Sequence, residues 1–128
     1  MNTIEEILKA LETIDYSVFT EEYIDDILDN RDNDPFDSEW CRVCDEIENL
    51  KNNDNYTKSN ESEFLEITQK AFKILESNNC GELSSYISDD FGLIYDSLIL
   101  NYKDEWLDKL IDTYKNRKIP TGELNDLV

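Results

Sequence analysis

Histidine is absent from this 128-residue sequence, and glycine, proline and cysteine are scarce, with three, two and three residues. The lack of histidine excludes Ser-His and Cys-His nucleophile pairs and any imidazole base. Three glycines are too few for a phosphate-binding loop of the GxGxxG or GxxxxGK[ST] type. Because glycine and proline interrupt regular structure, their scarcity favours helices over many short strands. We therefore expect a helical protein that is not an enzyme.

Basic residues are also few, since 12 Lys and Arg stand against 31 Asp and Glu, which gives a formal net charge of −19. This charge disfavours direct binding to nucleic acid or to an anionic membrane, because both would be repelled. The sequence has no run of about eighteen apolar residues and no basic leader followed by an apolar stretch. We expect a cytoplasmic monomer whose natural partner is a basic protein.

Apolar residues nevertheless make up 39% of the sequence, and there are 14 Phe, Tyr and Trp residues. This content is too high and too regularly spaced for a disordered acidic tail. The apolar side chains recur at three- and four-residue steps, which predicts an all-α fold, a single compact domain of about six or seven helices in a bundle or in stacked helical hairpins. The helical domain is expected to span residues 1–118, with a polar surface loop at 51–62 and a loose C-terminal tail at 119–128.

Capping residues and apolar spacing place the individual helices. The first three helices are expected at 3–14 behind a Thr3 cap, after a Thr20 cap, and from Asp34–Pro35 onwards. The others are expected around 64–75, as a short helix at 82–88, from Phe91 onwards, and around 106–114. In the second helix, Tyr23, Ile24 and Ile27 are expected to face inward with Leu28. The run FGLIYDSLIL (91–100) is the most apolar. It is expected to form the central buried helix, with a strand as the alternative, although no second strand offers itself for pairing.

The stretch DNRDNDPFDSEW (29–40) is similar in composition to a calcium loop, because carboxylates and amides recur at short intervals. An EF-hand needs oxygen ligands at positions 1, 3 and 5, Gly at 6 and Glu at 12. A loop starting at Asn30 has Pro35 in place of the Gly and Cys41 in place of the Glu. A loop starting at Asp32 has Phe36 at position 5. We therefore interpret the stretch as a connection between two helices and expect no metal or other cofactor.

Cys41 and Cys44 form a CxxC motif, and Cys80 is the only other cysteine. Without histidine the chain cannot supply the four N or S ligands of a structural zinc site. Redox CxxC motifs occur where the thiol pKa is lowered, whereas nearby acidic residues would raise it here. We expect three reduced thiols without a function, Cys44 in the core and Cys41 at its boundary.

Acidic residues are concentrated in residues 15–50, where thirteen acids and two arginines give −11 of the total −19. Four of them, Glu22, Asp25, Asp26 and Asp29, share one helical face because of their i, i+3, i+4, i+7 spacing. Soluble surfaces usually interleave basic residues with acidic ones, so this face suggests a binding surface. The candidate partner-binding residues are Glu21, Glu22, Asp25, Asp26, Asp29, Asp32, Asp37, Glu39, Asp45 and Glu48. The competing interpretation is a solvated face that serves solubility.

The sequence resembles bacterial toxin-immunity proteins, above all those of contact-dependent growth-inhibition systems, and its opening MNTIEEILKALETIDYSVFTEEYIDDILDN is similar to that class. The resemblance is one of type across the whole chain and transfers no residue role. It implies a cognate toxin that is commonly a basic nuclease, often acting on tRNA, whose substrate groove the immunity protein covers with carboxylates in place of phosphates. Tyr16, Phe19 and Trp40 would be apolar anchors beside the charges.

Two other functions fit the same composition. A nucleic-acid mimic would present the acids to a host DNA-binding or restriction protein, spaced to follow a duplex. An acidic helical adaptor would use its charge for solubility alone.

Overall fold

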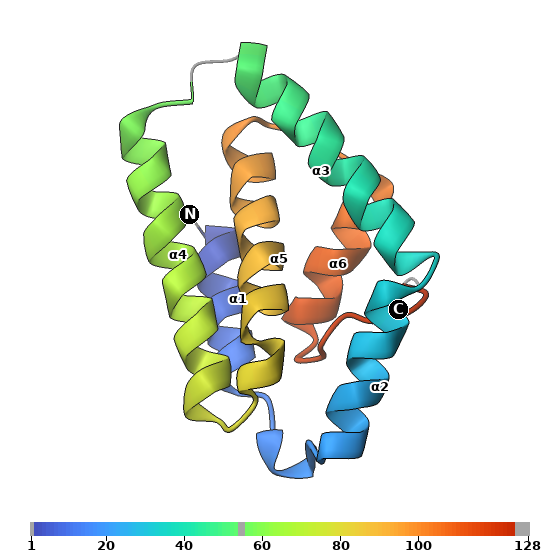
Figure 1. Ribbon diagram of the computed structural model, residues 1–128. Helices are drawn as coiled ribbons and strands as arrows, with labels where there is room; N and C mark the ends of the chain where they lie inside the picture. The colour runs from blue at the N-terminus through green and yellow to red at the C-terminus, as the bar shows by residue number, and fades with distance from the viewer. Residues whose placement is uncertain (1, 54–55, 125–128) are drawn as a thin grey trace.

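Six α-helices and one short 3-10 helix make up the part of the chain that the computed structural model describes, residues 2–53 and 56–124 (Figure 1). The helices are α1 (Asn2–Glu12), η1 (Tyr16–Val18), α2 (Glu21–Asp32), α3 (Phe36–Asn53), α4 (Lys58–Ser77), α5 (Gly81–Ile99) and α6 (Glu105–Lys115). No strand occurs in these described ranges, which confirms the all-α prediction. None of the helices described is both long and apolar enough to cross a membrane.

Helix α5 is the central element, and most of its surface is covered by other helices (Figure 1). All side chains from Asp90 to Ser97 are buried, so the apolar run that begins at Phe91 is the buried helix that its spacing predicts. The prediction of a separate short helix at 82–88 was wrong, because α5 is continuous from Gly81 to Ile99.

Helices α4 and α5 form the closest helix pair, an antiparallel hairpin (Figure 1). The turn between them is closed by the Cys80 N–H, which donates to the Leu75 carbonyl at 2.9 Å. Further along, Gly92 allows the two helices to approach, since a Cβ at this position would lie 2.6 Å from Cζ of Phe64.

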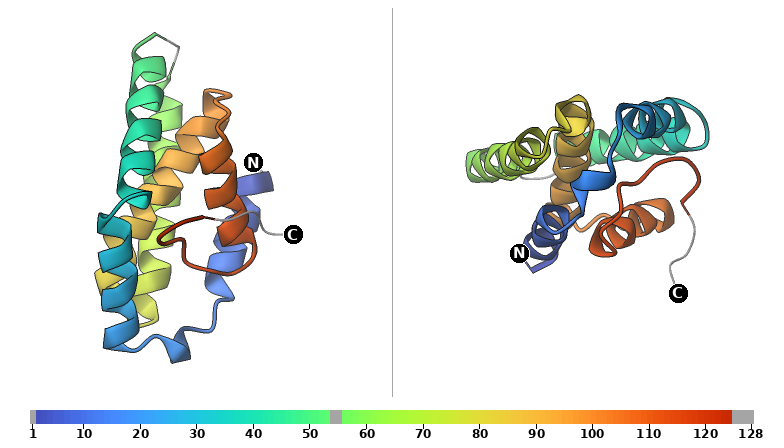
Figure 2. Two further views of the ribbon diagram at one scale, coloured as in Figure 1. Left: turned by 90° about the vertical axis from the view of Figure 1, so that its right-hand side faces the viewer. Right: turned by 90° about the horizontal axis from the view of Figure 1, so that it is seen from below.

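Helices α2 and α3 follow one another along one side of the molecule, as Figures 1 and 2 show. The Thr20 side chain accepts from the Tyr23 N–H and caps α2, as its sequence predicts. Ile24 and Ile27 are buried as expected, but Tyr23 is 45% exposed and does not face the core. The Thr3 cap was also placed wrongly, because α1 already includes Asn2.

Two segments expected to be irregular are more ordered than their composition suggests. The polar segment 51–62 is helical at both ends, because α3 continues to Asn53 and Thr57 starts α4 in a capping box with Asn60. Within the expected loose tail, Ile119 and Leu124 are buried, and the Thr121 hydroxyl donates to the Ile27 carbonyl at 2.9 Å. The segment 119–124 therefore packs against α2, whereas the last four residues lie outside the described part of the chain.

Candidate partner-binding surface

The carboxylates of α2 lie on the face opposite its buried side chains. Ile24, Ile27 and Arg31 point into the core, and the six candidate acids of this helix are all exposed. Among the described residues, none of the six has an ion-pair partner within 4 Å. The helix therefore presents uncompensated negative charge to solvent. Repulsion between these like charges destabilises the helix.

The candidate acids of α3 divide between two flanks of the helix. Helical spacing places Asp37, Asp45 and Glu48 on one flank, and all three are exposed. Glu39 lies on the other flank and is half-buried, where its carboxylate accepts from Arg42 at 2.7 Å. We therefore define the acidic surface without Glu39, as Glu21, Glu22, Asp25, Asp26, Asp29, Asp32, Asp37, Asp45 and Glu48.

The two arginines of residues 15–50 do not offset this surface. Arg42 binds three carboxylates at 2.7–2.9 Å. Two of them, Glu39 and Glu46, belong to α3, and the third is Asp104, the N-cap of α6. Arg31 is only 5% exposed. Neither guanidinium is available to neutralise the exposed acids of α2, so the local charge facing solvent is more negative than the sequence count implies.

The Arg31 side chain is held by a buried carboxylate, Asp90 of α5. Nη2 lies 2.7 Å from Oδ1 and Nη1 lies 3.1 Å from Oδ2, and Nη1 also donates to the Pro120 carbonyl at 2.8 Å. Asp90 accepts two further hydrogen bonds, from Trp40 Nε1 at 2.9 Å and from the Tyr114 hydroxyl at 2.5 Å. Burial lowers the pKa of Arg31, but the Asp90 charge, the hydrogen bonds to Asp90 and the nearby Tyr114 together outweigh it, so the pKa is raised.

The Asp90 carboxylate of α5 binds side chains of α2, α3 and α6, and Arg31 extends this network to the C-terminal segment through the Pro120 carbonyl. Burial raises the pKa of Tyr114 well above its usual range, so its hydroxyl remains a donor. This network fixes how α2 and α3 sit on the bundle, and so it also fixes where the acidic surface points.

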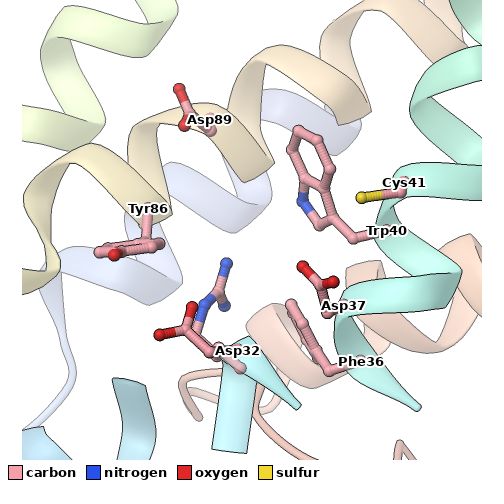
Figure 3. A pocket seen from close by; sticks show the side chains of 8 residues that line it. Asp32, Phe36, Asp37, Trp40, Cys41, Tyr86 and Asp89 are labelled. Carbon is pink, nitrogen blue, oxygen red and sulfur yellow. The ribbon is translucent and has the colours of Figure 1, made fainter. Parts of the chain in front are cut away.

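An open pocket with a volume of about 230 Å³ lies where α2, α3 and α5 meet (Figure 3). Tyr86 of α5 lies across this pocket from Phe36 and Trp40 of α3, with Asp32 at the end of α2 (Figure 3). The complete lining is Arg31, Asp32, Phe36, Asp37, Trp40, Cys41, Tyr86 and Asp89. Since Asp32 and Asp37 both belong to this lining, the acids of α2 and those of α3 meet here.

Sequence reasoning missed Arg31, Asp90, Tyr86 and Asp89. A signal existed for the buried pair, because Arg31 continues the Ile24–Ile27 spacing and Asp90 lies between Ile87 and Ile94 on one face of α5. No sequence signal joins Tyr86 and Asp89 to α3, because the contact depends on how the helices pack.

The three cysteines are free thiols that differ in burial from the expectation. Cys80 is fully buried, Cys44 is half-buried, and Cys41 is exposed. Burial raises the pKa of all three thiols, and neighbouring carboxylates raise it further. This is the opposite of what a reactive cysteine requires. In the described part of the chain, no cluster of three or more Cys, Asp and Glu is arranged to hold a metal ion.

Replacing Cys80 with Ser is expected to lower the free energy of unfolding by about 1–3 kcal/mol, because it buries a more polar hydroxyl. Urea unfolding measures this difference. Cys41→Ser is the matched control and should change neither stability nor partner binding, because its side chain is exposed. Loss of partner binding in Cys41→Ser with an intact fold would assign a function to the CxxC motif.

Comparison with known families gives a match over nearly the whole chain. A family profile described as Immunity protein PIM1 matches residues 3–121, which include the acidic surface and the pocket. No curated protein and no solved structure gives a significant match.

Proposed function

The chain belongs to the immunity protein family PIM1, and from this premise we propose that it neutralises a basic toxin by covering the toxin's substrate groove with its acidic surface. The toxin is a nuclease in this proposal, with tRNA as a candidate substrate. The immunity protein acts as a monomer in the cytoplasm, against a toxin delivered by contact-dependent growth inhibition. It acts by binding and contributes no catalytic group.

The observation that carries the proposal is the uncompensated charge of α2. Its six exposed carboxylates have no ion-pair partner among the described residues, and Arg31, its only basic residue, is buried against Asp90. A nuclease groove carries Lys and Arg to bind phosphates, so a rigid array of carboxylates meets a complementary field there. Such fields can raise association rates towards 10⁸–10⁹ M⁻¹s⁻¹ at low salt, and rapid capture is what an antidote requires.

Apolar anchors for tight binding lie beside the charged face, although they are not all the residues that the sequence suggested. Tyr16 is buried and donates to the Leu11 carbonyl at 2.7 Å, so it serves the fold. Val18 is 61% exposed, and the Phe19 ring packs edge-on against the exposed Tyr23 ring at 5.0 Å between centroids. Val18, Phe19 and Tyr23 therefore form an apolar patch next to the first acids of α2, which supports a desolvated contact.

The test uses the cognate toxin domain, which the neighbouring genes would identify. Co-expression should protect cells from the toxin, and the purified protein should block its nuclease activity. The association rate, measured by stopped flow between about 0.05 and 0.5 M salt, should fall steeply as salt increases. A toxin without a basic groove, or an association rate that does not depend on salt, would contradict the proposal. Tight binding to a host DNA-binding protein without protection from the toxin would favour the nucleic-acid mimic.

A further inference from the structure

The pocket between α2, α3 and α5 combines aromatic walls with uncompensated negative charge. Tyr86 is 39% exposed and Trp40 half-buried, so both rings are partly open to an incoming group. Asp32, Asp37 and Asp89 also line the pocket and are exposed, and none has an ion-pair partner within 4 Å among the described residues. The positive charge of Arg31 in the lining is balanced by Asp90 behind it, so the pocket is strongly negative.

The guanidinium of Arg31 belongs to the pocket lining but is already engaged. Its Cζ lies 4.4 Å from the centroid of the Phe36 ring and 5.9 Å from that of the Tyr86 ring, and both Nη atoms are bonded. Nε has no acceptor in the described structure, but this atom is itself buried, so a group bound in the open pocket would not reach it. The groups that the pocket offers to a ligand are therefore the three exposed carboxylates and the two partly exposed rings.

We propose that this pocket receives one arginine residue of the basic toxin, so that it is the anchor of the interface. The inference rests on the proposed function, because it names the chemistry that the acidic surface recognises. The arginine guanidinium would pack against the exposed parts of the Tyr86 and Trp40 rings and donate to Asp37 and Asp89.

Arginine fits this lining better than lysine does. A guanidinium is planar and weakly hydrated, stacks on aromatic faces, and can donate to two carboxylates at once. The raised pKa of Asp89 also favours binding of a cation. Partial loss of hydration and the neighbouring Asp90 charge raise the pKa of Asp89, and a bound guanidinium would remove this cost of ionisation.

The experiment needs no toxin, because a short peptide can probe the pocket in the full chain. Ac-Gly-Arg-Gly-NH₂ is titrated into ¹⁵N-labelled protein, and the signals of Trp40 Nε1–H and Arg31 Nε–H are followed by NMR. Both signals should shift and saturate. The citrulline peptide, which has the same shape without the charge, should cause no saturable shift, and the lysine peptide should bind more weakly. Equal binding of the arginine and citrulline peptides, or of the arginine and lysine peptides, would overturn the proposal.

Variants separate pocket binding from general attraction to an acidic protein. The double variant Asp37→Asn/Asp89→Asn should weaken binding of the arginine peptide by about tenfold, and Tyr86→Ala should weaken it as well. The matched control Asp108→Asn/Asp112→Asn removes the same charge from two exposed positions of α6, outside the acidic surface, and should have little effect. If the control weakens binding as much as Asp37→Asn/Asp89→Asn does, the attraction is diffuse and the pocket is not a site.

The same variants separate this inference from the proposed function. If Asp37→Asn/Asp89→Asn loses the peptide but binds the toxin as the wild type does, the pocket does not hold the toxin and the inference fails, while the function stands. If no form of the protein protects against the toxin, the function fails, whatever the peptide does.

Discussion

Replacing Glu22 and Asp26 of α2 with Lys is expected to slow association with the basic toxin by about tenfold at low salt. The rate should also depend less on salt, because the substitutions reverse the charge of two of the six carboxylates of the uncompensated face. Both side chains are exposed and unpaired, so the fold should be preserved. New i, i+3 pairs with Asp25 and Asp29 would relieve repulsion within the helix, while the two lysines, which are i, i+4 apart, would repel each other. Stopped-flow association measured at several salt concentrations provides the result.

A matched control is available on α6. Asp108 and Asp112 are also exposed and four residues apart, and Asp108, like Glu22, is in the first turn of its helix. Asp108→Lys/Asp112→Lys changes the net charge by the same amount and should alter the rate much less. Asp104 is unsuitable for this purpose, because it caps α6 and binds Arg42. If the α6 variant slows association more than the α2 variant does, the interface lies on another face. If neither changes binding, the charge serves solubility.

The helices could be predicted from the sequence where apolar spacing is regular. Their boundaries could not be predicted where polar residues are buried. The polar residues Ser88, Asp89 and Asp90 suggested a break before Phe91. In the structure the Ser88 hydroxyl donates to the Thr68 carbonyl of α4 at 3.0 Å, and Asp90 is bonded within the core. The helix therefore continues through these residues, because tertiary partners satisfy groups that local sequence treats as surface.

The acidic face of α2 could be predicted because helical periodicity alone determines it. The pocket could not, because it joins residues 31–41 with Tyr86 and Asp89, and only the packing of α5 against α2 and α3 brings them together. The environment of Arg31 could not be predicted for the same reason. A charged residue on an apolar face indicates a buried partner, but the sequence does not identify that partner.

Replacing Asp90 with Asn is expected to lower the free energy of unfolding by about 3–5 kcal/mol. The substitution keeps the size of the side chain but removes the charge that balances Arg31, which then remains buried and positive. It also replaces one of the two carboxylate oxygens that accept from Trp40 and Tyr114 with an amide donor. Urea unfolding followed by Trp fluorescence measures the loss, and the midpoint should shift without a large change in slope.

The adjacent residue supplies the control. Asp89→Asn removes the same charge at an exposed position, and it should leave stability unchanged or slightly increased. The raised pKa of Asp89, caused by partial burial and the Asp90 charge, means that folding disfavours its ionised form.

Arg31→Met should also destabilise the protein strongly. The double variant Arg31→Met/Asp90→Asn should cost less stability than the sum of the two single changes, because it leaves no unbalanced charge. A loss below about 1 kcal/mol in Asp90→Asn, or additive costs in the double variant, would show that the network does not hold α2 and α3 in place. The orientation of the acidic surface would then have to come from apolar packing alone.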